Sequence, residues 1–177
     1  YKGYMISDKL YSHSGVTPTT DKSANDFDRY AAARGKGYQR IDFQQHCVIA
    51  FMLYAKYGNR NLQAILGIGG AKCNPPTQTG SSDANGNADT KNERLKYVCG
   101  LGIEGVFGGI NELTKGATVT DGNWEITDPD GSTRRITSVA YDGWISGVAA
   151  EDGPFFDMIP TRTEGSESTY YSDRFIT

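Results

Sequence analysis

The chain has 177 residues, with 18 basic and 21 acidic side chains and a net charge of −3. This length indicates one domain, with two small domains as the alternative, and the slightly acidic balance argues against the basic surface that binds nucleic acid. The three cysteines are an odd number, which argues against a full disulfide framework.

Residues 1–20 mix aliphatic and tyrosine side chains with turn residues, and they predict one or two short strands that end in GVTPTT. Ser23 and Asp26 then favour the start of a helix that closes at Gly35. The helical period places four residues on one face of this helix: Phe27, Tyr30, Ala31 and Arg34.

The segment 41–58 predicts the main helix of the chain. Asp42 stands at the N-cap position and Gln45 follows three residues later, which is a capping-box pattern, and Gly58 suits a left-handed C-cap. From Cys47 to Ala55 there is no charged residue, Gly or Pro. This run is too short for the ~20 residues that cross a bilayer, so we expect a helix buried on nearly all sides and no membrane insertion.

Residues 71–94 form a long polar segment with almost nothing to bury. Loops of this length are often functional or mobile. Cys73 and Cys99 flank the segment, and their pairing is left open. No CxxC or HxxxH spacing occurs, which disfavours a zinc site.

The last third of the chain predicts β structure. Two alternating runs, 124–127 and 134–139, flank the turn sequence DPDG, which is a strong hairpin signal. Together with the helices, this pattern predicts a single α+β domain over residues 1–177, with two helices packed on a small twisted antiparallel sheet and long loops.

Three segments, in this order, resemble formylglycine-generating-enzyme-like (sulfatase-modifying factor-like) domains, which have the C-type lectin fold. They are GYQRIDFQQHCVIAFMLYAKYGN from Gly37, GNADT at Gly86–Thr90, and GLGIEGVFGGINEL at Gly100–Leu113. The first segment, with FFDMIPT near the C-terminus, looks most like the lectin-like proteins of phage tails and the variable proteins of diversity-generating retroelements. The resemblance implies display of binding loops, a homo-oligomer (a trimer being one form), and a place on a virion or a bacterial cell surface.

The chain departs from this family in two places. Gly109, Ile110, Asn111 and Leu113 replace the polar and Trp positions of the family signature. The family's closing strands, of "RGGSW" and "GFR" type, are not found before Thr177. The resemblance therefore implies either that these strands are missing here or that another chain completes the sheet.

Other motifs favour structural roles over chemistry. His46 and Asp42 lie four apart, a spacing that suits acid–base work, but a histidine in the first turn of a buried helix is more often structural. GIGGAK, from Gly67, lacks the full spacing of a phosphate-binding loop. DPDG could offer carboxylates to calcium, yet a hairpin turn is favoured because the acidic spacing of a calcium loop is absent.

Aromatic residues of the C-terminal third lie among Gly, Ser and Asp, a composition typical of binding loops. For Trp124 and Trp144 a place in the core of a sheet is favoured over a binding role, although Trp144 is kept among the binding candidates. The expected ligand-binding residues are Tyr141, Trp144, Tyr170, Tyr171, Asp173 and Arg174.

These observations predict a non-catalytic protein that binds a host cell-surface receptor or another macromolecular ligand. No cofactor is expected, with a structural calcium ion left open. One alternative is a structural subunit of a tail or surface fibre. A relative of the formylglycine-generating oxidases is the second, but no cysteine follows Cys99 to form the reactive pair of that enzyme class.

Overall fold

The computed structural model describes residues 1–67, 77–86, 88–89, 97–107, 110, 112–121, 123–136, 143–144, 147–150, 158–162 and 174–175. The chain divides into two compact units. Unit 1 consists of Tyr1–Arg40 and Gln63–Leu113, and unit 2 consists of Ile41–Leu62 and Thr114–Thr177. Helices and small antiparallel sheets occur together, which confirms the α+β class. The lectin-like fold stays a prediction.

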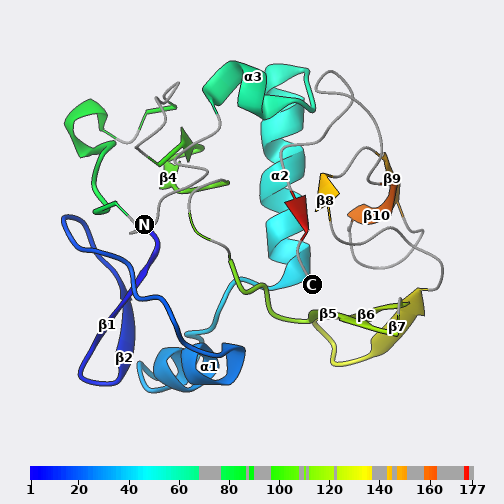
Figure 1. Cartoon of the computed structure of the whole chain (residues 1–177), viewed down its shortest axis with the longest axis horizontal. Helices are drawn as coiled ribbons and strands as arrows, with labels where there is room; N and C mark the ends of the chain where they lie inside the picture. The colour runs from blue at the N-terminus through cyan, green and yellow to red at the C-terminus, as the bar shows by residue number, and fades with distance from the viewer. Residues whose placement is uncertain are drawn as a thin grey trace. The chain divides into compact units, whose positions relative to one another are not determined.

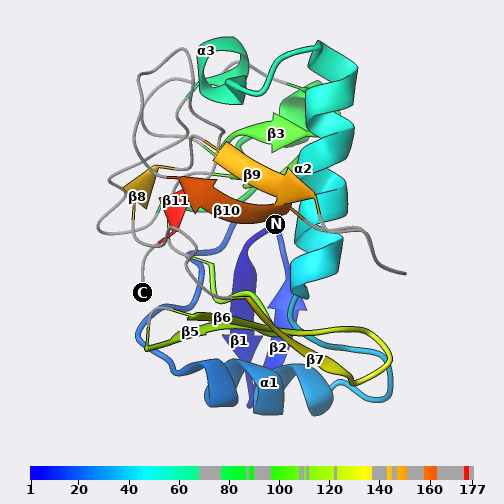
Figure 2. The same ribbon diagram turned by 90° about the vertical axis from the view of Figure 1, so that its right-hand side faces the viewer.

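Unit 1 begins with an antiparallel hairpin of β1 (Gly3–Ile6) and β2 (Lys9–Ser12), as expected for the first twenty residues. The helix α1 (Ala24–Ala32) lies beside the hairpin and contacts β2 (Figures 1 and 2). The short strands β3 (Cys99–Gly100) and β4 (Ile103–Glu104) form a second antiparallel pair. The 3₁₀ turn η1 (Asp83–Asn85) also belongs to unit 1, and so does the short helix α3 (Leu62–Leu66) apart from its first residue.

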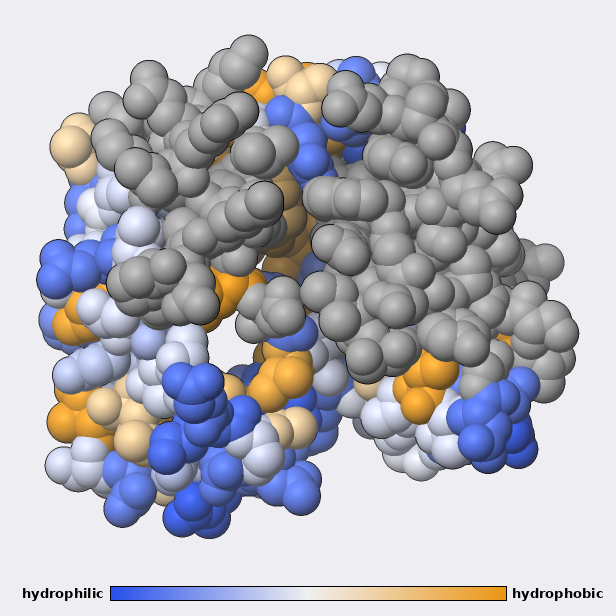
Figure 3. Space-filling model, viewed as in Figure 1, coloured by the Kyte–Doolittle hydropathy of each residue, from blue (hydrophilic) through white to orange (hydrophobic). Residues whose placement is uncertain are grey.

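The predicted cap of α1 is confirmed, because Ser23 and Asp26 form a reciprocal capping box. The helix ends at Ala32, before the expected stop at Gly35. It buries Tyr30 and Ala31, whereas hydrophilic residues dominate the visible surface where α1 lies (Figure 3). This division is what an amphipathic surface helix requires.

The helix α2 (Phe43–Tyr57) belongs to unit 2, and both of its predicted ends are confirmed. Asp42 and Gln45 form the capping box, and Gly58 has the left-handed conformation, with φ 60° and ψ 24°. The sheet of unit 2 has the order β5–β6–β7, formed by Ala117–Thr120, Asn123–Thr127 and Thr133–Ile136.

The core of unit 2 lies between α2 and this sheet. Phe43 and Cys47 from α2 form one buried cluster with Trp124 and Ile126 from β6. The rings of Phe43 and Trp124 lie 5.7 Å apart, centroid to centroid, and their planes are tilted by 46°. This separation is within the range that aromatic pairs prefer. Trp124 is 1% exposed, so its interpretation as a core residue is confirmed.

The expectation that α2 is buried on nearly all sides is wrong. Val48, Phe51 and Met52 are 42%, 50% and 51% exposed, while Cys47 and Leu53 are almost fully buried. The apolar composition predicted burial of the whole helix, but the cluster formed with β6 covers one side of it.

The hairpin around DPDG is confirmed, with β6 and β7 on either side of the turn. A strand that the sequence analysis did not separate, β5, precedes it. Thr120 pairs with Asn123, so the connection between β5 and β6 is the two residues 121–122. Asp-Gly is a typical two-residue hairpin loop, and Asp121 has the positive φ (50°) that such loops need.

Candidate functional site

Two of the expected ligand-binding residues lie on paired strands. Trp144 belongs to β8 (Gly143–Trp144) and Arg174 to β11 (Arg174–Phe175). These strands are antiparallel, and Trp144 and Arg174 are direct partners in the register. The backbone thus brings together two candidates that are far apart in sequence. The other four, Tyr141, Tyr170, Tyr171 and Asp173, lie outside the described residues.

A second strand pair follows β8 in the chain. β9 (Gly147–Ala150) and β10 (Met158–Arg162) are antiparallel, and the register shifts between Pro160 and Arg162. Bulges of this kind re-aim side chains and are common beside binding sites. The pairs β8–β11 and β9–β10 are the strands described in the segment that the sequence analysis associated with binding.

The polar segment 71–94 was expected to bury almost nothing, but it contains buried residues. Thr79 is 4% and Ser82 2% exposed. Thr79 donates from its hydroxyl to the carbonyl of His13 (2.6 Å), and its backbone amide donates to the carbonyl of Val16 (2.9 Å). Part of this segment is therefore held against the N-terminal residues of unit 1 by hydrogen bonds, which composition could not reveal.

The buried carboxylate of Glu104 also binds this segment. Its Oε1 accepts from the amide of Gly80 (2.7 Å), and its Oε2 accepts from the amide (2.9 Å) and the hydroxyl (2.7 Å) of Ser82. Ser81 also donates from its hydroxyl, at 3.2 Å. Glu104 is only 3% exposed. These hydrogen bonds therefore replace the water contacts that its carboxylate loses on burial. Glu104 was not among the predicted site residues, and no local pattern in the sequence marks it.

Cys99 is the cross-strand partner of Glu104, and its side chain is a fully buried thiol. It therefore does not form the disulfide with Cys73 that the sequence left open, and Cys73 itself lies outside the described residues. Burial raises the pKa of the Cys99 thiol, against a smaller opposing effect of its hydrogen bond with Ser82. A thiol with a raised pKa is a poor nucleophile at neutral pH.

The carboxylate of Asp42 serves the cap of α2. Its Oδ1 accepts from the amide of Gln45 (2.8 Å), and the amide of Asp42 donates to Oε1 of Gln45 (3.1 Å). This contact is the one expected of a structural residue at a helix start. The phosphate-loop motif GIGGAK lies outside the described residues apart from Gly67. Gly67 directly follows α3, and its amide donates to the carbonyl of Gln63.

The carboxylates of the DPDG turn accept hydrogen bonds from other side chains of this protein. Both carboxylate oxygens of Asp128 accept from Arg134, and Nε2 of Gln44 donates to Oδ1 at 2.9 Å. Asp130 accepts from the hydroxyl and the amide of Ser132. The hairpin interpretation, favoured over calcium binding, therefore has a structural basis. Within the described residues there is no group of three or more His, Cys, Asp or Glu side chains that could hold a metal ion.

Comparison with protein-family models, with characterised proteins and with solved structures found no match to this chain. Across the described part of the chain, no helix has the length and apolar character to cross a membrane.

Proposed function

We propose that this chain is a non-catalytic binding protein that presents its C-terminal segments to a macromolecular ligand on a cell surface. The pairing of Trp144 with Arg174 carries the proposal. Trp and Arg, together with Tyr, are the residues that most often dominate binding energy at protein interfaces. A strand pair that fixes the backbone of both residues reduces the ordering cost of binding.

The composition around these strands supports the same function. The segments 141–146 and 163–173 supply Tyr, Ser, Gly and Asp. Tyrosine offers a large contact area at a low entropic cost, while Ser and Gly adapt to the ligand. Together with the resemblance to lectin-like phage-tail and retroelement proteins, this composition favours a receptor-binding or diversified surface protein on a virion or bacterial surface.

The test is adsorption of the labelled full-length chain to a panel of bacterial cells. Tyr170→Ala with Tyr171→Ala, and separately Arg174→Ala, are compared with Arg135→Ala, which removes an exposed arginine from β7. Loss of adsorption in the first two variants, with folding and oligomeric state unchanged, supports the proposal. Equal adsorption by all variants contradicts it.

The second candidate is a structural subunit of a tail or surface fibre, and the exposed apolar residues of α2 favour it. In that case the tyrosine variant would change assembly rather than adsorption. A third candidate, an oxidase related to formylglycine-generating enzymes, requires a metal. Stoichiometric copper or iron in the purified protein would contradict the binding function and favour this enzyme.

A further inference from the structure

Arg34 follows α1 and is held against two tyrosine rings. Its guanidinium carbon lies 4.0 Å from the ring centroid of Tyr11 and 4.5 Å from that of Tyr38. Nη1 of Arg34 also donates to the carbonyl of Leu10 at 3.0 Å. Leu10 and Tyr11 belong to β2, the strand that α1 contacts (Figures 1 and 2). Three neighbours therefore fix the position of the guanidinium.

The sequence after α1 folds Tyr38 back over Arg34. Gly35 and Gly37 have positive φ values of 120° and 90°, a region of backbone conformation that glycine enters at little cost. The amide of Tyr38 donates to the carbonyl of Gly35 at 3.3 Å and so closes a turn. This turn brings the ring of Tyr38 against the guanidinium of Arg34.

No carboxylate of the described residues forms an ion pair with Arg34. The arginines nearest to it in the sequence differ in this respect, because Arg29 binds Asp26 and Arg40 binds Asp28. Arg34 is partly buried, so its charge has lost some of its water without gaining a counter-ion. An anion from outside the chain would supply that counter-ion.

The groups of Arg34 that remain for such an anion are Nε and Nη2. Neither forms a hydrogen bond with a described residue, since Nη1 makes the bond to Leu10. Arg40 and Arg134 use the same two nitrogens to bind the two oxygens of an aspartate carboxylate. Paired N–H groups of this geometry suit carboxylates and phosphates. Arg34 can therefore make the contact that Arg40 and Arg134 make within the chain.

The two segments that hold Arg34 carry further positive charge. Lys9 is exposed on β2, and Lys36 is exposed in the turn after α1. Neither 9–12 nor 33–38 contains an Asp or a Glu. The charge of this surface therefore complements an acidic partner.

Tyrosine and arginine are enriched in the parts of protein interfaces that bind most strongly. Tyr38 is 52% exposed, so its ring is accessible to a partner. From these observations we propose that Arg34, Tyr11 and Tyr38 form a docking site for an acidic segment of a partner protein, one of whose Asp or Glu carboxylates binds Nε and Nη2 of Arg34. Lys9 and Lys36 attract the other carboxylates of that segment. The site belongs to unit 1 and does not depend on the C-terminal binding residues proposed above.

Side chains, and not backbone pairing, make this contact. On β1, the carbonyl of Gly3 accepts from the amide of Thr19, and the amide of Met5 donates to the Thr19 hydroxyl, both at 2.9 Å. On β2, the carbonyl of Leu10 accepts from Arg34. These groups are the ones that an added strand would need, so the partner is recognised through its carboxylates.

The first test measures binding of two labelled synthetic peptides to the full-length chain by fluorescence anisotropy. One peptide alternates Glu with Gly, and the other has Gln in place of each Glu. The acidic peptide is expected to bind about tenfold tighter or more and to weaken as salt is added. Equal binding of the two peptides overturns the proposal. Polygalacturonate carries carboxylates on a carbohydrate, and tighter binding of this polymer than of the acidic peptide overturns the assignment to a protein partner.

The second test identifies the site. Arg34→Lys keeps the charge but loses the paired N–H groups, and it should weaken binding of the acidic peptide about tenfold. Lys36→Gln, in an exposed position, should weaken it by less. Arg135→Lys makes the same exchange on β7 and should change nothing. Arg174→Ala should also bind the peptide normally, so the two proposed sites are tested separately.

Amide NMR spectra of each variant show whether it is folded, and they locate the peptide on the unaltered chain. The amides of Tyr11 and Tyr38 are expected to shift when the acidic peptide is added. Binding that is the same in Arg34→Lys and the unaltered chain, or shifts that avoid both tyrosines, overturns the assignment of this site.

Discussion

Arg134 holds the carboxylate of Asp128 with two parallel hydrogen bonds, Nε to Oδ2 at 2.7 Å and Nη2 to Oδ1 at 2.8 Å. The two residues stand on either side of the turn between β6 and β7. The side chain of Asp128 is 3% exposed and that of Arg134 28%, so the pair is shielded mainly on the acidic side. Gln44 adds a hydrogen bond from α2 and so links the helix to the turn.

Replacing Asp128 with Ala should destabilise unit 2 by about 2–3 kcal/mol, below the usual cost of breaking a fully buried pair because Arg134 reaches solvent. The measurement is urea unfolding followed by tryptophan fluorescence. Asp130→Ala is the control in the same turn, since its carboxylate is exposed and bonds only Ser132 among the contacts described. Equal losses for the two variants would show that the turn, and not the ion pair, matters.

Replacing Glu104 with Gln should loosen the segment 79–83. A glutamine of the same shape presents an NH₂ group to donors, so at least one of the bonded groups is left unsatisfied in a buried site, at a cost of about 1–3 kcal/mol. Hydrogen exchange should become faster at the amides of Gly80 and Ser82, which Glu104 now binds. Glu125→Gln in unit 2 is the control. Unchanged protection at both amides would contradict this role of Glu104.

Gly80 is expected to tolerate no side chain. Its φ is +91°, and a Cβ atom there would lie 2.2 Å from Oγ of Ser14 and 2.9 Å from Oδ2 of Asp83. Gly80→Ala combines this clash with backbone strain of order 1–3 kcal/mol. Gly86→Ala is the matched control, because Gly86 also has a positive φ (+61°) but open space around it. Thermal unfolding should therefore show a larger loss for Gly80→Ala, and equal losses would show that the clash relaxes freely.

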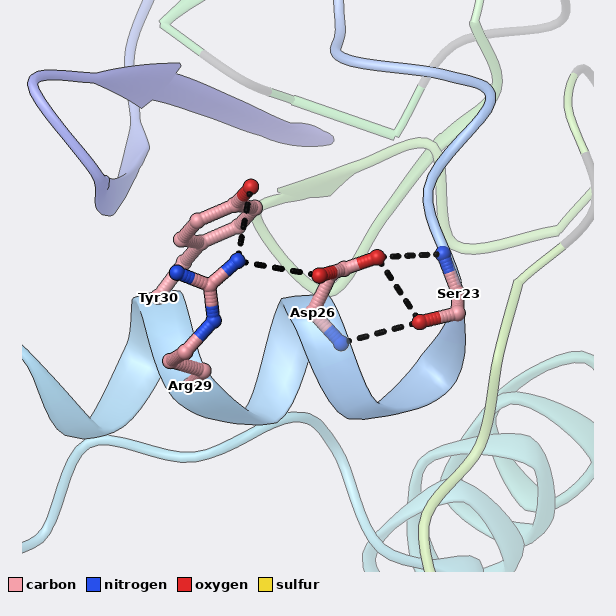
Figure 4. Close-up of polar contacts among 4 residues, drawn as sticks. All are labelled: Ser23, Asp26, Arg29 and Tyr30. Carbon is pink, nitrogen blue, oxygen red and sulfur yellow. Dashed lines mark hydrogen bonds and ion pairs between the residues drawn. The ribbon is translucent and has the colours of Figure 1, made fainter.

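The cap of α1 predicts a pH dependence. The pKa of Asp26 is lowered to about 2, first by the hydrogen bond from the Ser23 hydroxyl and then by Arg29 (Figure 4). Because the pKa of Asp26 in the folded protein lies below its ordinary value of 3.8, the contribution of Asp26 to stability is present above pH 3.8 and is lost as pH falls toward 2.

An NMR titration of the Asp26 carboxyl measures this directly. In Ser23→Ala the pKa should move up toward 3.8, and in Arg29→Gln it should move in the same direction by less. Both variants keep the helix sequence otherwise intact, so helicity by circular dichroism serves as the folding control. A pKa that stays near 2 in Ser23→Ala would show that the hydroxyl is not its main cause.

Sequence patterns predicted the elements that depend on near neighbours. The caps of α1 and α2 each involve residues three apart, and the β6–β7 hairpin is specified by the turn between its strands. The hydrogen bonds of these features join residues that are close in the chain, so the sequence alone is enough to predict them. The core position of Trp124 was favoured over a binding role, and its burial in the structure confirms it.

Contacts between distant residues could not be predicted in this way. Glu104 accepts hydrogen bonds from a segment more than twenty residues earlier, and Trp144 is the register partner of Arg174 in the β8–β11 pair. In both cases the residues near one partner in the sequence do not indicate the other. The candidate binding residues were chosen from composition, and the structure adds the strand pairing for two of them only.

Capping residues and composition are local properties, so the sequence predicted where α2 starts and ends and that its run from Cys47 to Ala55 carries no charge. Which side of α2 is buried depends instead on the elements that pack against it. Phe43 and Cys47 contact β6, whereas Phe51 and Met52 remain half exposed. Apolar composition sets how much surface favours burial, but the arrangement of the neighbouring elements sets how much of it is covered within one chain.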